Sequence, residues 1–182
     1  MSKRLIQKDP LTHVDDDMLT FRPNFARNLA QMRKHFELSY NELGGAINGT
    51  GAALSDIEKD RTTTTMNRFE KLCKYFAIEP QEFVKKKLKL AKTGAKSPKA
   101  RATKGVFNIN LCHNLSLAIK SHGVSFITIA EYAGVSPSTI WRIQTSQDVN
   151  VSLPIVERIS ICLGIPFQEL IGRKIAKKEF KQ

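Results

Sequence analysis

The sequence predicts an all-α protein that consists of two similar helical domains, and three observations support this prediction. Apolar residues recur at intervals of three and four positions through most of the chain, which is the period of an amphipathic helix. Residues of the first half reappear in the second half at a constant offset of 86 or 87 positions, which indicates a duplicated architecture. The two halves are separated by a Lys-rich segment, 85–105, with the composition of a linker.

The first half is expected to contain a flexible N-terminal arm, 1–20, and a domain of five helices, 21–84. The arm shows no sustained hydrophobic period, which is typical of a loosely held terminus. The domain's helices are expected near 23–36, in 39–57 (two helices), at 66–76 and at 80–84. Its expected core is Leu43, Leu54, Ile57, Phe69, Leu72 and Phe76.

The second half is expected to repeat this order in a second domain, 106–172, followed by a basic tail, 173–182. One additional residue in the loop after its third helix explains why the offset changes from 86 to 87. Corresponding pairs include Leu29 and Leu115, Ser39 and Ser125, Leu43 and Ile129, Leu54 and Ile140, and Ile78 and Ile165. The expected core of this domain is Ile129, Ala133, Ile140, Ile143, Ile159 and Leu163.

The stretch 125–143 is the most informative part of the chain, because it has the pattern of two short helices with a sharp turn between them. Ser125 is expected to cap the first helix. Gly134 follows where that helix must end in a left-handed conformation, which glycine adopts at little cost. Ser136 is expected to cap the second helix, with Pro137 at its first position, where a missing N–H costs nothing.

The second helix of this stretch is expected to bury Ile140 and Ile143, which leaves its other faces for contacts with a partner. The caps, the glycine and the inward positions together resemble the helix-turn-helix of the lambda-repressor-like (Xre/Cro) family, whose second helix enters the major groove of DNA. The resemblance covers about 21–84 and 106–172, and it implies two tandem five-helix domains joined by a basic linker. The DNA-binding residues expected in this stretch are Ser125, Ser136, Pro137, Ser138, Thr139, Trp141 and Arg142.

Arg142 and Trp141 each have a second interpretation. Arg142 is expected to contact a base, because a guanidinium can donate two hydrogen bonds to guanine. The alternative for Arg142 is a surface ion pair with Glu131. The alternative for Trp141, the only tryptophan of the chain, is a half-buried packing anchor.

The corresponding turn of the first domain is less suited to reading bases. Asn48 occupies the left-handed position, and Gly49 stands where the second domain has Val135. The next helix offers few donors to base edges on its expected outward face, and its one charge there repels phosphate. These expected outward positions are Gly51, Ala52, Ser55 and Asp56.

The positive charge of the chain is concentrated outside the two domains. The formal net charge is +12, of which 85–105 contributes +9 from nine basic residues and no acidic residue. Residues 1–84 hold twelve basic and twelve acidic residues, and the tail 173–182 holds five basic residues and one acidic residue. This excess favours a polyanionic partner, and we expect the linker to contact DNA phosphates rather than to serve only as a solvated spacer. The expected linker contacts are Lys92, Lys96, Lys99, Arg101 and Lys104.

The sequence does not support several other classes of protein. It contains no Ser/His/Asp or Cys/His catalytic set, no metal-ligand spacing and no phosphate-binding loop, so we expect no enzyme, no cofactor and no metal. Cys73, Cys112 and Cys162 show no close pairing, which predicts free thiols in a reducing, cytoplasmic compartment. No apolar run approaches the ~18 residues of a membrane-spanning helix.

The resemblance implies a sequence-specific regulator that binds double-stranded DNA, and a repressor in preference to an activator. Two-domain members without a ligand domain are similar to regulators carried by phages and other mobile elements. The alternative function is a protein-interaction or homodimerisation module of the antitoxin or anti-defence type, in which the first domain does not read DNA. Phe126 and Ile127 favour a docking surface of this kind, because an exposed apolar pair is expected there. A third function is sequence-independent binding of nucleic acid through the linker.

Overall fold

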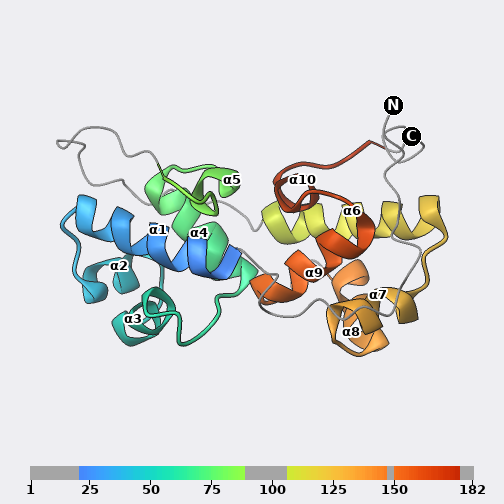
Figure 1. The fold of residues 1–182 in the computed structure, drawn as a ribbon, viewed down its shortest axis with the longest axis horizontal. Coiled ribbons are helices and arrows are strands. Elements are labelled where there is room, and N and C mark those ends of the chain that lie inside the picture. Colours follow the sequence, from blue (N-terminus) through green and yellow to red (C-terminus); the bar gives the residue numbers. More distant parts are fainter. Residues whose placement is uncertain (1–20, 89–105, 147–149, 177–182) are drawn as a thin grey trace. The chain divides into compact units, whose positions relative to one another are not determined.

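Helices form all of the regular secondary structure in the residues that the computed structural model describes, which are 21–88, 106–146 and 150–176. Over these ranges the chain contains ten α-helices and no β-strand (Figure 1), so the predicted all-α class is confirmed. None of these helices is both long enough and apolar enough to cross a lipid bilayer.

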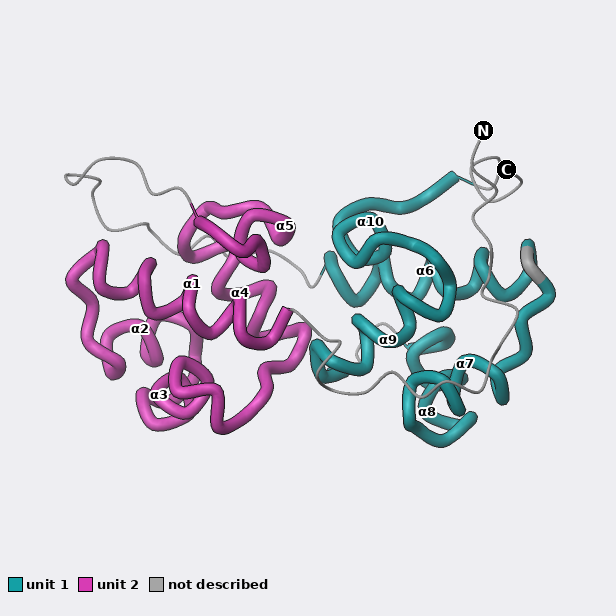
Figure 2. The backbone as a smooth tube through the Cα atoms, viewed as in Figure 1, with its two compact units in different colours: residues 1–19, 104–182 teal, residues 20–103 magenta. Residues whose placement is uncertain are grey.

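The described residues divide into two compact units, an N-terminal unit, 21–88, and a C-terminal unit, 106–176 (Figure 2). The helices of the N-terminal unit are α1 (Phe21–His35), α2 (Tyr40–Ala46), α3 (Gly51–Glu58), α4 (Met66–Phe76) and α5 (Pro80–Phe83). Those of the C-terminal unit are α6 (Val106–His122), α7 (Phe126–Ala133), α8 (Pro137–Thr145), α9 (Leu153–Leu163) and α10 (Phe167–Gly172). The first helix therefore begins two residues before the expected Pro23.

Aromatic side chains dominate the core of the N-terminal unit. Phe25 of α1 packs edge-on against Phe69 of α4 and Phe83 of α5, with ring centroids 5.2 Å and 5.0 Å apart. Phe36 stacks on Phe76 at 5.8 Å. All six residues of the predicted core are buried, because they lie on the inward faces that the helical period assigns to them.

Aliphatic side chains dominate the core of the C-terminal unit. The helix α6 packs against α8 and α10, and α7 packs against α8 and α9. The six residues predicted for this core are buried as well. Leu111, Leu115 and Phe167 are also buried there.

Three helix ends repeat their backbone conformation in the two units. Left-handed residues occur at Glu37 and Gly123, at Asn48 and Gly134, and at Ala77 and Gly164. The members of each pair are 86 or 87 positions apart, as the predicted repeat requires. The C-terminal unit has glycine at all three positions, whereas the N-terminal unit has side chains with a Cβ there, at a cost of about 1 kcal/mol each.

A buried asparagine of the first helix holds the end of each unit. Asn28 and Asn114 correspond at an offset of 86, and both side chains are 0% exposed. Asn28 Nδ2 donates to the carbonyl oxygens of Phe83 and Lys85, both at 2.8 Å. Asn114 Nδ2 donates at 2.8 Å to Leu170 O and to Arg173 O, and Asn114 Oδ1 accepts a hydrogen bond of 2.8 Å from the Ile175 amide.

These bonds extend both units beyond the positions where the linker and the tail are expected to begin. Arg27 donates to the carbonyl oxygens of Lys85 and Lys86. The Ile175 side chain is buried. The contacts of the units therefore continue past positions 84 and 172. The expected arm 1–20 and the linker residues 89–105 lie outside the described residues.

The left-handed helix ends predict opposite effects for two substitutions. Ala77→Gly should stabilise the protein by about 0.5–1 kcal/mol, because it removes a Cβ from a left-handed residue. Gly164→Ala should destabilise it by a similar amount, for the same reason. Urea denaturation followed by circular dichroism measures both changes. The control is Ala52→Gly within α3, which should destabilise by about 1 kcal/mol, and a destabilising Ala77→Gly would contradict the prediction.

The asparagine contacts predict a local effect of Asn114→Ala. The substitution leaves buried carbonyl groups without a donor, at about 1–3 kcal/mol for each group that water does not reach. We expect a loss of stability and a loss of hydrogen-exchange protection at the Ile175 amide. The control is Lys120→Ala, an exposed position on the same helix. An Ile175 amide that stays protected in Asn114→Ala would show that another contact holds the chain end.

Candidate nucleic-acid interface

The turn between α7 and α8 has the predicted caps and the predicted left-handed glycine. Ser125 Oγ accepts a hydrogen bond of 3.1 Å from the Thr128 amide. Ser136 Oγ accepts one of 3.3 Å from the Thr139 amide. Gly134 has φ +66° and ends α7, and the amide of the next residue donates to Ala130 O at 2.9 Å. Local sequence therefore sets the geometry of this turn.

The two faces of α8 differ as the helical period predicts. Ile140 and Ile143 are buried against the core. Pro137, Ser138 and Arg142 are exposed, and Trp141 is 56% exposed. Trp141 therefore lies outside the core that its neighbour Ile140 enters, although its side chain is partly covered.

The Arg142 guanidinium is available to a partner. Among the described residues it has no ion pair and no side-chain hydrogen bond, so the proposed pair with Glu131 is not observed. Glu131 is itself exposed on α7. An unpaired, solvent-exposed guanidinium keeps five N–H donors free for acceptors of another molecule.

Three hydroxyl groups gather at the N-terminus of α8. Ser136 Oγ lies 2.8 Å from Ser138 Oγ and 2.9 Å from Thr139 Oγ1. Thr139 is half-buried, so its side chain supports the cap rather than the open face of the helix. Ser138 is exposed, and its hydroxyl can exchange the bond to Ser136 for one to a ligand.

The DNA contacts that the sequence predicts outside α8 are only partly described by the structure. Ser125 is exposed at the start of α7. The expected apolar pair beside it is exposed at one residue only: Ile127 is 58% exposed, whereas Phe126 is half-buried. The expected linker contacts, namely Lys92, Lys96, Lys99, Arg101 and Lys104, lie outside the described residues.

The corresponding turn of the N-terminal unit differs in one respect from the prediction. Asn48 has φ +54°, as expected for the left-handed position. Gly51, however, is buried rather than outward. It lies so close to α2 that a Cβ there would be 2.3 Å from Asn41 Oδ1. The helices α2 and α3 meet at backbone distance, since a Cβ on Gly44 would lie 2.8 Å from Gly51 N. This close packing could not be read from the helical period.

The outward face of α3 therefore has little to offer a DNA base. Ala52 is exposed but carries no polar group. The carboxylate of Asp56 lies 3.9 Å from the Arg61 guanidinium, so its charge is already paired. Ser55 is half-buried.

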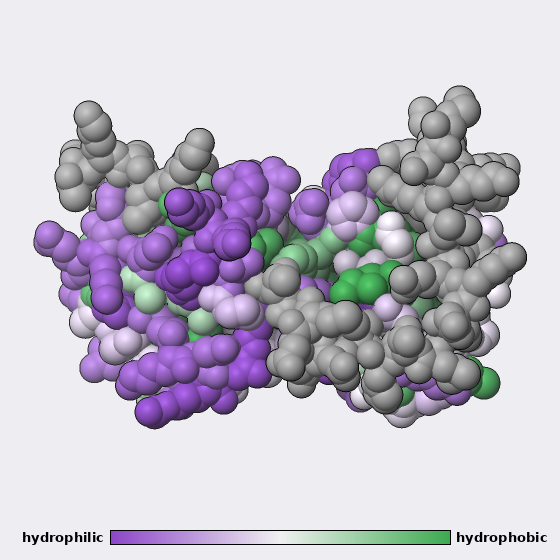
Figure 3. All heavy atoms as spheres, in the orientation of Figure 1, coloured by the Kyte–Doolittle hydropathy of each residue, from purple (hydrophilic) through white to green (hydrophobic). Residues whose placement is uncertain are grey.

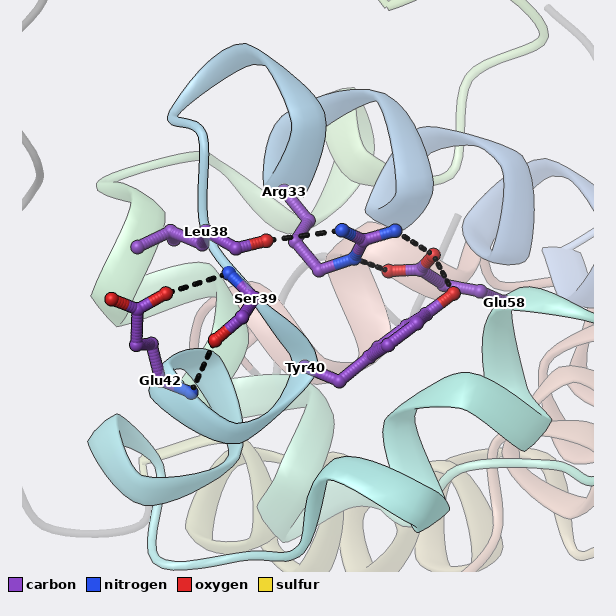
Figure 4. A network of polar contacts seen from close by, with 6 residues as sticks. All are labelled: Arg33, Leu38, Ser39, Tyr40, Glu42 and Glu58. Atoms are coloured by element: carbon purple, nitrogen blue, oxygen red, sulfur yellow. Dashed lines mark hydrogen bonds and ion pairs between the residues drawn. The ribbon is translucent and has the colours of Figure 1, made fainter.

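An ion-pair network that the sequence analysis did not predict joins α1, α2 and α3 (Figure 4). Arg33 donates to both carboxylate oxygens of Glu58, at 2.7 Å and 2.9 Å, and to Leu38 O at 3.0 Å. The Tyr40 hydroxyl donates to Glu58 at 3.0 Å, and the guanidinium lies 4.0 Å from the centre of the Tyr40 ring. The hydrogen bond with Glu58 raises the pKa of Arg33.

The same region contains a capping box. Ser39 Oγ accepts from the Glu42 amide, and the Glu42 carboxylate accepts from the Ser39 amide at 2.7 Å. These hydrogen bonds lower the pKa of Glu42. Ser and Glu three residues apart are the sequence signal that could have predicted this box.

The C-terminal unit has no equivalent of the ion-pair network. The positions of Arg33, Tyr40 and Glu58 are occupied there by Ile119, Phe126 and Gln144. Glu58, at the end of α3, therefore forms its hydrogen bonds and ion pair inside the N-terminal unit. The end of α8 carries no such charged pair among its described contacts.

Comparison with family models, with curated proteins and with solved structures finds no match to this chain.

The cysteines form no site with one another or with other metal-binding side chains. All three are free thiols, with Cys73 and Cys162 buried and Cys112 half-buried. No group of three His, Cys, Asp or Glu side chains gathers in the part of the chain that the structure describes. Burial raises the pKa of each thiol, to about 11 for Cys162.

These raised pKa values predict slow alkylation of the folded protein. At pH 8 a thiol with a pKa of about 11 has roughly 100-fold less thiolate than an ordinary thiol. Iodoacetamide should therefore label Cys73 and Cys162 far more slowly in native buffer than in urea, with Cys112 the fastest of the three. Mass spectrometry follows the labelling of each cysteine, and equal labelling rates in native buffer and in urea would contradict this prediction.

The same pKa shifts predict how stability depends on pH. Because the folded thiols keep protons that the unfolded chain releases, their contribution to stability is present below pH ~8.5 and is lost as the pH rises toward 11.

Proposed function

We propose that this protein binds double-stranded DNA sequence-specifically and reads base edges with the outward face of α8. The observation that carries this proposal is the unpaired Arg142 beside exposed Trp141 and Ser138, on a helix whose opposite face is buried. A short helix of this kind fits the major groove, where each base pair presents a distinct pattern of donors and acceptors.

Each exposed side chain of α8 would have a separate role in the groove. The Arg142 guanidinium can donate two hydrogen bonds to guanine, which is worth about 1–3 kcal/mol of discrimination. The Ser138 hydroxyl can serve either kind of base. The Trp141 ring can contact a thymine methyl group or the sugar. The N-terminus of α8 with its Ser136 cap would lie toward a phosphate, because the helix dipole favours an anion there.

Phosphate contacts from the basic segments would supply much of the affinity. The linker 85–105 contributes +9 to the net charge of +12. Each phosphate that it neutralises adds about 0.9 to the slope of log affinity against log salt concentration. Base reading by α8 and charge neutralisation by the linker would thus act together in one chain.

Two tandem helix-turn-helix domains of the lambda-repressor-like kind form part of this proposal. The repeat of the left-handed helix ends and of the buried asparagines supports a duplicated domain. A protein of this kind would repress transcription by occupying its site on the chromosome, in the cytoplasm of the cell.

A second candidate function is docking of a protein partner or of a second copy. It is favoured by Ile127, which is 58% exposed, and by the outward face of α3, where Ala52 offers no base contact. In this alternative the N-terminal unit does not read DNA. An assay of base preference separates the two functions, because a docking module has none.

The proposal predicts the effect of Arg142→Ala on DNA binding. Selection of bound duplexes from random DNA would first define the preferred sequence. The substitution should then weaken binding to that sequence by about 1–3 kcal/mol and relax the preference at one base position. The matched controls are Ala52→Ser and Ser55→Ala in α3, which should change binding little. Loss of binding in the α3 variants, with Arg142→Ala unaffected, would reverse the assignment of the reading helix.

A further inference from the structure

The outward face of α4 in the N-terminal unit carries two cations without a partner among the described residues. Arg68 and Lys71 are three positions apart, so they lie on one side of the helix. Lys71 is exposed and Arg68 is half-buried, and neither takes part in an ion pair or a side-chain hydrogen bond there. In the view of Figure 3, the surface of this unit is mainly hydrophilic.

No free acid on α4 offsets these two charges. The only acidic residue of the helix is Glu70, whose side chain is 3% exposed and forms an ion pair with Lys74. Glu79, the next acidic residue along the chain, follows the C-terminal end of the helix, away from Arg68. The exposed side of α4 is therefore positively charged.

The corresponding helix of the C-terminal unit keeps one of these cations and uses it differently. At an offset of 87, Arg68, Lys71 and Lys74 correspond to Ile155, Arg158 and Ile161 of α9. Arg158 donates to Ala133 O at 3.2 Å, so its guanidinium is used inside its own unit. Ile161 is 40% exposed. The face of α9 thus combines two isoleucines with an arginine that is bonded inside its own unit, whereas Arg68 and Lys71 on α4 have no such bond.

The N-terminal unit as a whole favours an anionic partner. Residues 21–88 hold twelve basic and eight acidic residues, a difference of +4. Five of the eight acidic residues already form ion pairs within the unit, namely Asp56, Glu58, Asp60, Glu70 and Glu82. The outward face of α3 lacks cations, whereas α4 carries Arg68 and Lys71 three positions apart, so α4 offers a pair of neighbouring cations to a polyanion.

We propose that the N-terminal unit binds the phosphate backbone of duplex DNA through the Arg68 and Lys71 face of α4 rather than through α3, an inference that rests on the proposed function. The two side chains would neutralise two phosphates and contribute affinity without base preference. The C-terminal unit would supply the sequence preference, and the N-terminal unit would hold a neighbouring stretch of the same duplex.

The test uses the full chain with Arg68→Gln and Lys71→Gln combined. The slope of log affinity against log salt concentration is measured on a duplex of random sequence. Loss of two phosphate contacts should lower this slope by about 1.8, at ~0.9 per phosphate. The ranking of DNA sequences should stay as in the wild type. Circular dichroism and thermal unfolding check that the variant is folded.

The matched control combines Lys34→Gln and Lys59→Gln, two exposed positions of the same unit with the same change in charge. Its slope should fall by less than about 0.5. Equal slopes for the two double variants would overturn the inference, because net charge alone would then explain the effect. An α4 variant with the wild-type slope would overturn it as well.

Three further outcomes separate this inference from its alternatives. The acidic run Asp15–Asp17 of the arm could cover α4 in place of DNA. If the α4 substitutions change the salt slope in the full chain but have no effect once 1–20 is deleted, the arm is the occupant of α4 and the inference is wrong. Loss of base preference in Arg142→Ala, with no effect of the α4 variant, would support the proposed function and overturn only the role of α4. A wild-type chain that binds no duplex would overturn both.

Discussion

A fully buried asparagine amide on the first helix of each unit ties the end of that unit to its beginning. The last carbonyl groups of a helix have no partner within the helix, and in both units those of the fifth helix are turned toward the core. Asn28 and Asn114 donate to these carbonyls and to the residues that follow. Without such a donor, each buried carbonyl would lose its hydrogen bond to water on folding and would have no donor in the folded state. The helix α6, held in this way against α10, also packs on α8, so the orientation of the proposed reading helix depends on this contact.

The two units keep this constraint and the left-handed helix ends, but they fill the space between the helices differently. The N-terminal unit combines Phe25, Phe69 and Phe83 with the ion-pair network of Arg33. The C-terminal unit uses aliphatic side chains and has Ile119 at the position of Arg33. The surfaces differ even more, since α8 carries Arg142 where α3 carries Asp56, and α4 carries Arg68 and Lys74 where α9 has Ile155 and Ile161. The two units thus share these backbone features while their exposed faces differ in charge.

This division suggests how one chain could combine specificity with affinity. Specific recognition needs donors that are free of internal partners and held on a rigid element, which is the situation of Arg142 on α8. Backbone binding needs only positive charge, which in the proposed function would come from the basic linker sequence and from the Arg68 and Lys71 face. The two proposed roles fall on different parts of the chain, so separate substitutions test each of them.

The sequence by itself determined the features that arise within a few residues of one another. The helical periods, the caps at Ser125 and Ser136, the left-handed glycine and the inward side of α8 follow from local sterics and local hydrogen bonds. The repeat predicted the correspondence of the two cores. Tertiary structure alone decided the burial of Gly51 against α2 and the bonds that Arg33 forms with Glu58 and that the two asparagines form with the chain ends. The bonds to Glu58 and to the chain ends join residues 25 to 61 positions apart, and the period of a helix carries no information about how closely two helices approach.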